Sequence, residues 1–503
     1  MFYNELLLPL GLECPTELFG VEVAGIATDS ERVVENCIFI CVSGTRYDGH
    51  DYVNEAISAG ARVIVAEKVR NECVGGAALL YVENTRRAAA LLYNLWYGDP
   101  ASKMRFVGVT GTNGKTSVAY MLYGILQSVG YKTGLIGTVE ALCAGKQLAR
   151  CTGMTTPDPE TLYSTLAKMY REGVELVVME VSSHALAQRR TDAIVFECAV
   201  FTNLSEEHLD FHRDMEDYYK AKRKLFCRVK SAVLNVDDTA GKRIFDSLCD
   251  VETLKKSCSR REGDFCALDV KCNFQTTEYL LVRENDKCNA HRVVLPLAGE
   301  FQVMNSLEAI AAAEMLGVDT AAACGALERI QRISGRLELV DAEGINVFID
   351  YAHTPDALER VLRSVRSFMP REARLILLFG CGGDRDRSKR KTMGQIASRL
   401  ADFTVVTSDN SRSESPREII KDILKGINKE KEFVVIESRR DAIIAAISQY
   451  ARQGDTVLLA GKGHEAYEID STGRHPFDER EIVKHALERR DEINSRKGKK
   501  NEG

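Results

Sequence analysis

The sequence predicts an α/β fold divided into three domains, and two observations carry this prediction. The chain has 503 residues, which is more than one hydrophobic core normally organises. Short apolar runs alternate with helical patterns along most of its length, as they do in βαβ units. We expect a small mixed α/β N-terminal domain over 1–100, a central parallel-sheet domain with an antiparallel edge over 101–334, and a C-terminal doubly wound, Rossmann-like domain over 335–503.

Each domain has its own strand signals. The first has apolar runs at 37–42 and 62–66, and Tyr97-Gly98-Asp99-Pro100 is typical of an exit linker. The central domain has strand runs at 106–109, 176–179, 199–201 and 232–234, and a helical pattern over 116–128. Several short alternating runs over 258–294 favour the antiparallel edge. The third domain has strand runs at 347–349, 375–379, 403–406, 433–436 and 456–460.

Composition and charge limit the class of protein. With 45% apolar and 28% charged residues the chain is an ordinary soluble protein, and its net charge of −6 argues against a nonspecific nucleic-acid binder. The 15 scattered cysteines contain no C-x-x-C pair, which favours free thiols in a reducing compartment. Residues 1–12 lack the parts of a signal peptide, and no run of about 18 apolar residues occurs. We expect a cytoplasmic protein with no membrane insertion and no nucleic-acid partner, and we expect it to act as a monomer.

The most informative segment is Gly111-Thr112-Asn113-Gly114-Lys115-Thr116, between a strand run and a helical pattern. Its glycines let backbone N–H groups converge on anionic oxygens, and the helix N-terminus adds partial positive charge. Lys115 would reach the β- and γ-phosphates of a nucleotide, and the Thr116 hydroxyl would ligate Mg²⁺. Strict Walker spacing is not met, because Val109 stands where the first glycine is required. The segment predicts a variant phosphate loop in a P-loop ATPase domain, and the alternative is a glycine turn that only joins strand to helix.

Further polar side chains follow the other strands of the central domain. Glu180 leaves the sheet beside two serines and an imidazole, and it is a candidate Mg²⁺ ligand opposite Thr116. The run 203–212 follows the next strand and is dense in metal-ligating residue types, among them His208. A surface histidine or a hydrogen-bonded core histidine is the alternative there. Sequence physics alone predicts that Lys222 is an ordinary solvated lysine.

The third domain carries four polar runs at the carboxyl ends of its strands. These runs are 350–356, 380–387, 409–412 and 461–465. The first run places Asp350 and His353 at a helix start, where a carboxylate and an imidazole would face a nucleotide. Arginines in the second and third runs suit carboxylates or phosphates through bidentate bonds. Each run could instead be a capped turn, but four of them in one domain favour a binding site.

Together these motifs resemble the Mur ligase family, and within it the MurE group, the UDP-N-acetylmuramoyl-tripeptide synthetases. The resemblance spans nearly the whole chain, through T-G-T-N-G-K-T, M-E-V-S-S-H-A-L, T-N-L-S-x-x-H-L-D-F-H, D-Y-A-H-T-P-D-A-L, F-G-C-G-G-D-R-D and G-K-G-H-E. It implies an ATP-dependent amide ligase of peptidoglycan synthesis. The N-terminal domain would bind the UDP-substrate, the central domain ATP and the C-terminal domain an amino acid.

The resemblance also implies a role for each matching position. The metal ligands and catalytic groups would be Thr116, Glu180, His208, Lys222 and Lys115. Lys222 falls where the family has a carbamylated lysine, and a carbamate is a carboxylate-like metal ligand. The resemblance therefore replaces the prediction of a solvated lysine with that of a metal ligand. ATP would contact Gly111, Thr112, Asn113, Gly114, Lys115, Thr116, Asn305, Arg336, Asp350 and His353. The UDP-N-acetylmuramoyl-dipeptide would contact Ser30, Thr155, Thr156, Ser182, Gln188 and Arg190. The incoming amino acid would contact Arg385, Asp409, Asn410, Arg412, Gly461 and Glu465.

The implied mechanism follows from charge. The terminal D-glutamate carboxylate attacks the γ-phosphate of ATP to give an acyl phosphate, while Mg²⁺ and Lys115 neutralise the developing charge. An amine then displaces phosphate through a tetrahedral intermediate. In similar enzymes that add meso-2,6-diaminopimelate the loop D-N-P-R supplies an arginine for the free side-chain carboxylate. Here Ser411 replaces the proline but Arg412 remains, and an L-lysine substrate would leave this guanidinium without its partner.

Three alternatives stay open beside the favoured meso-2,6-diaminopimelate ligase. One is an L-lysine-adding enzyme of the same group, and another is a different Mur ligase or a folylpolyglutamate-type ligase. The amino acid that triggers phosphate release separates these. A catalytically silent, MurE-like assembly protein is the third, and the presence of Lys115, Thr116 and Glu180 argues against it.

Overall fold

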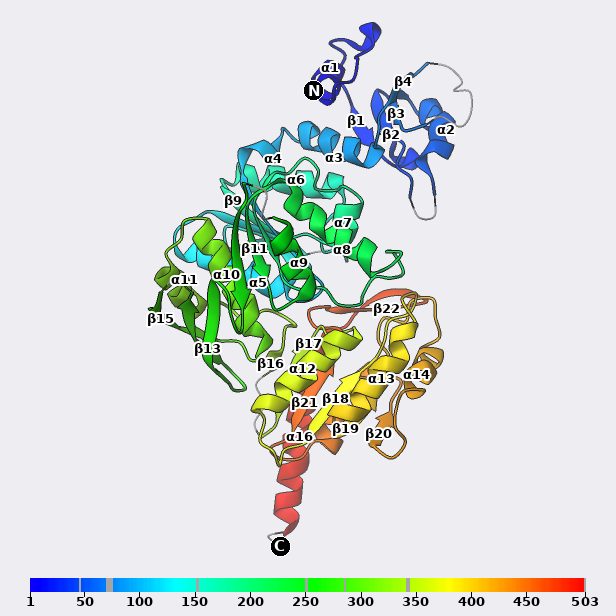
Figure 1. Ribbon diagram of the computed structural model, residues 1–503. Helices are drawn as coiled ribbons and strands as arrows, with labels where there is room; N and C mark the ends of the chain where they lie inside the picture. Colours follow the sequence, from blue (N-terminus) through cyan, green and yellow to red (C-terminus); the bar gives the residue numbers. More distant parts are fainter. Residues whose placement is uncertain are drawn as a thin grey trace. The chain divides into compact units, whose positions relative to one another are not determined.

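The computed structural model describes residues 1–44, 47–68, 76–150, 153–248, 252–284, 286–340 and 344–501 (Figure 1). The chain divides into two compact units. Unit 1 consists of Met1–Thr110, Gly130–Ala199 and Lys220–Ser231, and unit 2 of Gly111–Val129, Val200–Tyr219 and Ala232–Gly503. Among the described helices, none combines the length and the apolar character needed to cross a membrane.

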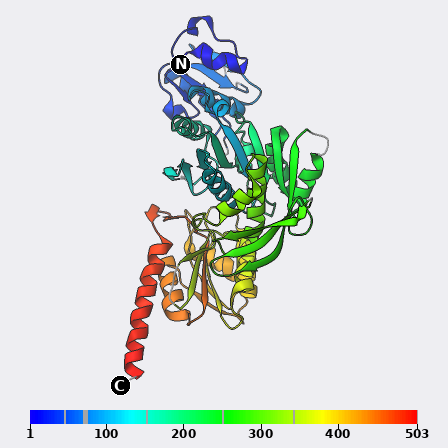
Figure 2. The same ribbon diagram turned by 90° about the vertical axis from the view of Figure 1, so that its left-hand side faces the viewer.

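The N-terminal part of unit 1 is a small parallel sheet with helices (Figure 2). Its strand order is β1 (Gly25–Ala27), β2 (Cys37–Ile40), β3 (Ala61–Ala66) and β4 (Ala78–Tyr81), and its main helices are α2 (Val53–Ser58) and α3 (Thr85–Trp96). Neighbouring strands all pair in parallel. The run Ala-Arg-Val-Ile-Val-Ala of β3 is buried at every position but Arg62, as expected for a strand covered on both faces. The strand runs predicted at 37–42 and 62–66 are confirmed.

The rest of unit 1 holds five strands of the large central sheet. Their order is β5 (Arg105–Thr110), β9 (Leu176–Glu180), β6 (Thr133–Ile136), β7 (Glu140–Cys143) and β8 (Lys146–Arg150). The first three are parallel, whereas β7 and β8 form an antiparallel edge that the sequence analysis did not predict. Two further strands, β10 (Phe196–Phe201) and β11 (Val229–Asn235), have residues in both units and come between β5 and β12 in the strand order.

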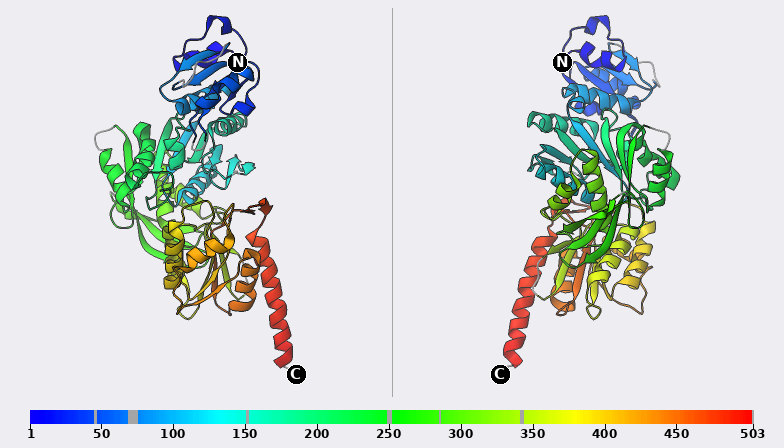
Figure 3. Two further views of the ribbon diagram at one scale, coloured as in Figure 1. Left: turned by 90° about the vertical axis from the view of Figure 1, so that its right-hand side faces the viewer. Right: turned by 60° about the vertical axis from the view of Figure 1, so that its left-hand side comes forward.

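Unit 2 contains the predicted antiparallel edge of this sheet (Figure 3). Its strands are β12 (Leu254–Ser259), β13 (Phe265–Cys272), β14 (Thr277–Arg283) and β15 (Asp286–Leu295). β12 pairs with β13 in parallel, and the other neighbours pair antiparallel. Helices of this region include α5 (Lys115–Ser128), α9 (Thr239–Ser247), α10 (Phe301–Met315) and α11 (Thr320–Leu327). α10 packs against β12, β13 and β14 and also against α5, so it is apolar around most of its circumference.

The C-terminal part of unit 2 is the predicted doubly wound sheet. Its strand order is β16 (Glu338–Val340), β17 (Asn346–Asp350), β21 (Thr456–Ala460), β18 (Leu375–Phe379), β19 (Phe403–Val406) and β20 (Glu432–Val435). All neighbours are parallel except β16, which pairs antiparallel with β17. Neither β16, which has only three residues, nor the hairpin of β22 (Tyr467–Asp470) and β23 (Gly473–Pro476), which is largely polar, was predicted from the sequence.

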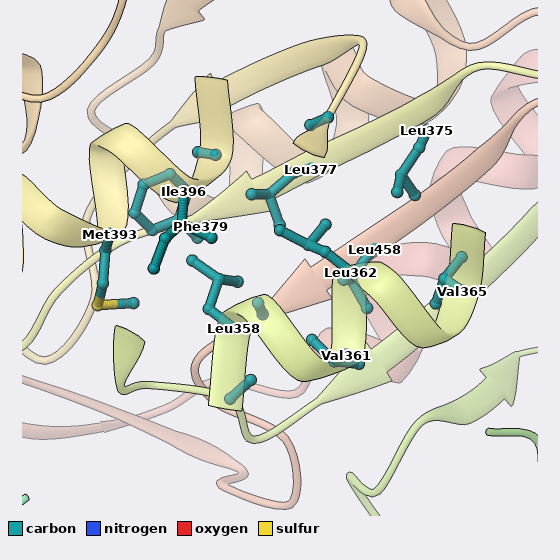
Figure 4. Close-up of a cluster of buried hydrophobic side chains, with 14 of the residues drawn as sticks. Leu358, Val361, Leu362, Val365, Leu375, Leu377, Phe379, Met393, Ile396 and Leu458 are labelled. Carbon is teal, nitrogen blue, oxygen red and sulfur yellow. The ribbon is translucent and has the colours of Figure 1, made fainter. Parts of the chain in front are cut away.

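Alternation along β18 shows how this sheet is buried on both faces. Leu375, Leu377 and Phe379 face α12 (Pro355–Phe368), α13 (Ser388–Leu400) and α14 (Pro416–Leu424), as Figure 4 shows in part. Ile376 and Leu378 face the opposite layer, formed by α15 (Arg439–Ala445) and α16 (Glu479–Asn501). A strand buried this way reads as a continuous apolar run. Truncating one such leucine to alanine lowers the free energy of unfolding by about 2–5 kcal/mol. The tightly packed core holds in place the strand ends that carry the site.

Candidate active site

The phosphate loop that follows β5 turns sharply at its two glycines. Gly111 has φ of +150° and Gly114 has φ of +88°, values that side chains rarely adopt. A Cβ atom on Gly111 would lie 1.9 Å from the Thr202 hydroxyl oxygen. One on Gly114 would lie 2.5 Å from Asn305 Oδ1. Both positions therefore require glycine, for backbone conformation and for space.

Thr202 and Asn203 hold this loop in shape. The Asn203 carbonyl accepts from the Thr112 N–H at 2.8 Å, and Asn203 Oδ1 accepts from the Asn113 N–H at 2.9 Å. The Thr202 hydroxyl donates to the Asn113 carbonyl at 2.6 Å. The sequence analysis read the run that begins at Asn203 as ligand-rich, but this first residue supports the loop instead. A polar pair directly after a strand neighbouring the loop strand is the signal that points to such a role.

The Lys115 ammonium group lies over the loop. Its Nζ donates to the Gly111 carbonyl at 3.0 Å and to the Thr112 carbonyl at 2.8 Å. Because α5 begins at Lys115, the cation is held at the positive end of a helix. This arrangement suits an anionic polyphosphate.

Arg336 approaches the same helix start from the C-terminal part of unit 2. Its NH2 donates to the Thr116 hydroxyl at 2.7 Å, and its guanidinium lies 5.0 Å from the ring centroid of Tyr351. The buried Arg336 Nε has no hydrogen-bond partner within the described residues. A buried donor of this kind normally has an acceptor, so the site fits a ligand that brings anionic oxygens.

Asp350 and Asn305 shape the surroundings of Arg336 and of the loop. The two carboxylate oxygens of Asp350 accept from the N–H groups of Leu337 at 2.6 Å and Ala352 at 2.8 Å. Burial raises the pKa of Asp350, although the Arg336 charge and the two backbone bonds oppose this shift. Asn305 is buried in α10, where its Nδ2 donates to Gln302 Oε1 at 3.0 Å.

Glu207 lies between two imidazoles, one from each half of the predicted site. His208 Nε2 is 3.6 Å from one of its oxygens and His353 Nε2 is 3.4 Å from the other. Burial favours the protonated form of Glu207, but the hydrogen bond from His353 and the charges around it bring its pKa below the usual range. Nearby, Asn113 Nδ2 donates to Asp356 Oδ2 at 2.8 Å. The structure thus brings the phosphate loop together with His208 and His353.

In unit 1, five of the residues predicted to hold the dipeptide substrate are linked to Glu180 through a series of hydrogen bonds. They are Thr155, Thr156, Ser182, Gln188 and Arg190. The Thr156 hydroxyl is 2.9 Å from the Glu180 carbonyl and accepts from the Ser182 N–H at 3.0 Å. Arg190 donates to the Thr156 carbonyl at 2.7 Å and to Gln188 Oε1 at 2.7 Å. Ser30 begins the short 3₁₀ helix Ser30–Arg32 of the same unit.

Sequence reasoning missed Thr138, which binds both oxygens of the Glu180 carboxylate. Its N–H donates to Oε1 at 2.8 Å and its hydroxyl lies 2.9 Å from Oε2. The hydroxyl is also 3.1 Å from that of Thr155. A Cβ atom on the preceding Gly137 would lie 2.4 Å from Glu180 Oε1, so the glycine lets this backbone approach the carboxylate. A Gly-Thr pair directly after a strand is the signal that could have found it.

Lys222 is only 1% exposed, in α8 (Met215–Arg223). The solvated lysine that sequence physics alone predicted is therefore wrong, because the helix turns this side chain into the protein. Within the described residues no group of three His, Cys, Asp or Glu side chains is placed to hold a metal ion. The predicted ligand set has only two members of these residue types, Glu180 and His208. It stays a prediction.

A second cluster lies at the carboxyl ends of β19 and β21. Asn410 Nδ2 donates to Glu465 Oε2 at 2.7 Å, and Tyr467 OH lies 3.3 Å from Glu465 Oε1. Arg412 donates to the carbonyls of Gly383 at 2.9 Å and Asn410 at 3.2 Å. The structure therefore brings together an amide, a carboxylate and a guanidinium, which suit a zwitterion with an extra carboxylate.

The other residues predicted for this cluster differ in their exposure to solvent. Arg385 is exposed and its NH1 lies 3.4 Å from the Asp384 carbonyl. Asp409 is buried, and a Cβ atom on Gly461 would lie 2.6 Å from its Oδ2. Burial opposes ionisation of Asp409, but the charges of Lys462 and Arg439 hold its pKa below the usual range.

Comparison with known proteins identifies the family of this chain. Three family models match: the Mur ligase family catalytic domain at residues 22–95, the Mur ligase middle domain at 109–313, and the Mur ligase glutamate ligase domain at 335–463. A UDP-N-acetylmuramoyl-L-alanyl-D-glutamate–2,6-diaminopimelate ligase of Clostridium acetobutylicum is 40% identical over 472 residues, which cover 92% of this chain and 94% of that protein.

Two solved structures extend the likeness. One of a UDP-N-acetylmuramoyl-L-alanyl-D-glutamate–2,6-diaminopimelate ligase is 29% identical with a TM-score of 0.69, covering 98% of this chain and 99% of that one. The MurF ligase of Thermotoga maritima, solved with ADP, shares the fold at 19% identity and a TM-score of 0.60, covering 93% of this chain and 98% of that one. Because a relative of 40% identity extends along almost the whole of both chains and the three models match in order, this chain belongs to the Mur ligase family.

Proposed function

We propose that this chain is an ATP-dependent amide ligase that adds meso-2,6-diaminopimelate to UDP-N-acetylmuramoyl-L-alanyl-D-glutamate in peptidoglycan synthesis. The observation that carries the proposal is the near full-length relative of 40% identity that bears this activity in its name. The phosphate loop and the cluster around Asn410 are the two kinds of site that such a reaction needs. We propose that the reaction takes place in the cytoplasm and that the chain acts as a monomer.

ATP is the proposed phosphoryl donor. Its phosphates fit the loop because Lys115 lies over it, Arg336 reaches Thr116, and the buried Arg336 Nε has no partner among the described residues. A ligase of the same fold has been solved with ADP, which supports an adenine nucleotide as the ligand. Asn305, Asp350 and His353 are proposed to complete the nucleotide site, and Gly111 to Thr116 to enclose its phosphates.

Mg²⁺ is proposed to be held by Thr116, Glu180, His208 and Lys222. The donor set fits this ion if Lys222 is carbamylated, because three of its four members then offer oxygen, which Mg²⁺ prefers. Lys222 is buried, so a carbamate formed on its amine nitrogen would be an anionic ligand inside the protein, where a bound cation would balance its charge. When bound, the ion would neutralise charge on the phosphate oxygens.

The proposed reaction has two steps, activation of the carboxylate and attack by the amine. The carboxylate of the D-glutamyl residue attacks the γ-phosphorus of ATP, its bond to ADP breaks, and an acyl phosphate forms. Lys115 stabilises the charge that gathers on the transferred oxygens. The amine then adds to the acyl carbon, loses a proton, and expels inorganic phosphate to leave the amide.

The proposed role of each domain follows from the positions of the substrate-binding residues in the sequence. We propose that 1–100, together with Thr155, Thr156, Ser182, Gln188 and Arg190 of the central domain, binds the UDP-substrate, and that Ser30 takes part. We propose 101–334 as the ATP-binding domain and 335–503 as the amino-acid domain. The separate sheets β1–β4 and β16–β21 and the ranges of the three family models support these boundaries.

Arg412 decides between the two candidate amines. A meso-2,6-diaminopimelate side chain ends in a second amino acid group, whose carboxylate suits Arg412 and whose ammonium suits Glu465. L-Lysine lacks this carboxylate, so its binding would desolvate the guanidinium without supplying an anionic partner. Arg385, Asp409, Asn410 and Gly461 are proposed to form the rest of the site.

Phosphate release with one component omitted at a time tests the proposal. We expect release from ATP only when UDP-N-acetylmuramoyl-L-alanyl-D-glutamate and meso-2,6-diaminopimelate are both present. Release with L-lysine in place of meso-2,6-diaminopimelate would establish the L-lysine-adding alternative. Release with folate and glutamate would establish a folylpolyglutamate-type ligase. No release with any amino acid would indicate a silent assembly protein.

A further inference from the structure

Lys462 is a fully buried cation beneath the amino-acid cluster. Its exposed fraction is 0%, and its Nζ lies 5.3 Å from the ring centroid of Phe477. Nζ donates to Asn410 Oδ1 at 2.9 Å and to the Tyr467 carbonyl at 2.9 Å. Asp409 Oδ1 is 3.8 Å away and supplies a counter-charge. Burying an ammonium group is costly, so these partners are needed to keep it inside the fold.

The bond to Asn410 fixes which way that amide points. An ammonium group and a backbone N–H can only donate, and Asn410 Oδ1 receives both the Lys462 ammonium and the Ile469 N–H, the latter at 3.0 Å. The oxygen of the amide is therefore identified by its partners. Its Nδ2 must point the other way, toward Glu465 Oε2 at 2.7 Å.

This orientation sets what the cluster can bind. If the amide were flipped, Asn410 Oδ1 would face the Glu465 carboxylate and Nδ2 would face the Lys462 ammonium, so both contacts would be repulsive. Glu465 would then lose the donor to its Oε2. Lys462 touches neither ATP nor the UDP-substrate as these are proposed to bind, and it reaches the amine site only through Asn410.

We propose that Lys462 is a positioning residue for the incoming amino acid: by donating to Asn410 Oδ1 it locks the amide so that Asn410 and Glu465 together receive the amine substrate. This inference rests on the proposed function, because it assigns the amine to this cluster. It concerns selectivity and affinity for the amine alone. The phosphoryl-transfer half of the site keeps all its contacts without Lys462.

The test is a kinetic comparison of Lys462→Met with the unchanged protein. Methionine keeps the length of the buried stem and removes the donors. We expect KM for meso-2,6-diaminopimelate to rise roughly ten- to a hundredfold, as for a buried hydrogen bond left unmade, while KM for ATP and for the UDP-dipeptide stays within about twofold. A matched control is Arg374→Met, which removes a cation paired with the buried Asp455 at 2.7 Å at the opposite end of the same sheet. It should lower the melting temperature without raising KM for the amine.

A double-mutant cycle separates positioning from general stability. If Lys462 acts through Asn410, Lys462→Met should raise KM for the amine no further in an Asn410→Ala background, whereas independent effects would multiply. Lys462→Met with an unchanged KM for the amine would overturn the inference, and so would equal rises in all three KM values. If the unchanged protein fails to ligate any amine, the proposed function has failed, and this outcome is distinct from an active protein in which Lys462→Met is silent.

Discussion

Glu308 is a carboxyl group enclosed in α10 with no hydrogen-bond partner for either oxygen within the described residues. Burial raises its pKa well above 4.5, and the charge of Asp238 raises it further. The buried thiol of Cys258 is close enough to be affected by the charged form of Glu308. In the folded protein Glu308 therefore keeps its proton at pH values where the unfolded chain has lost it.

We predict that Glu308→Leu stabilises the protein and that the gain increases with pH. Below pH 4.5 the side chain is protonated in both states and pH has no effect through it. Above that pH the unfolded chain releases a proton that the folded chain retains, so the free energy of unfolding falls by up to about 1.4 kcal/mol per pH unit until the folded pKa is passed. Leucine has a similar volume and no titration. Removing the unpaired polar atoms raises the free energy of unfolding by about 1–3 kcal/mol at every pH.

Urea unfolding followed by circular dichroism at several pH values from 5 to 8 measures this gain. Glu314→Gln is the control on the same helix, because Glu314 has partners, among them the Thr320 hydroxyl at 2.8 Å. Its removal should destabilise the protein slightly rather than stabilise it. A Glu308→Leu variant that is less stable than the unchanged protein, or whose gain is the same at pH 5 and pH 8, would refute the reasoning.

Three further predictions concern the two sites and the N-terminal sheet. Lys115→Ala should lower phosphate release by roughly a thousandfold or more with unchanged circular dichroism, since the cation over the loop is lost; an active variant contradicts its role. Arg412→Ala should raise KM for meso-2,6-diaminopimelate at least roughly tenfold and leave that for L-lysine unchanged, and equal changes would disprove the carboxylate contact. For Asp48, burial opposes ionisation but the hydrogen bond from His50 lowers the pKa from 3.8 to about 2, so Asp48→Asn should remove stability that is present above pH 3.8 and lost toward pH 2. Acid unfolding of both forms measures this, and an equal acid midpoint contradicts it.

The phosphate loop could be predicted because its chemistry is local. The glycine spacing and the following Lys115 lie within one strand–turn–helix segment, and the turn needs positive φ at Gly111 and Gly114. The strands of the C-terminal sheet could be predicted for a similar reason, since burial on both faces leaves continuous apolar runs.

What the sequence analysis missed depends on contacts between distant segments. Thr138 and Glu180 are far apart in the chain, and the Gly-Thr pair that follows a strand does not by itself identify Glu180 as the partner. Asn203 begins a run that is dense in metal-ligating residue types, but its side chain supports the phosphate loop. The burial of Lys222 depends on which face of α8 packs inward, and a short polar helix does not reveal that face. Strand β16 was missed because it is brief and pairs with β17 through its backbone.

The proposed reaction joins meso-2,6-diaminopimelate to the D-glutamyl end of the UDP-substrate. The most direct measurement incubates the protein with ATP, Mg²⁺, UDP-N-acetylmuramoyl-L-alanyl-D-glutamate and equal concentrations of meso-2,6-diaminopimelate and L-lysine, and identifies the product by mass spectrometry. The account predicts a tripeptide product that contains diaminopimelate in large excess over lysine, because only diaminopimelate offers Arg412 a carboxylate. A product that contains mainly lysine, or no new amide at all, would contradict it.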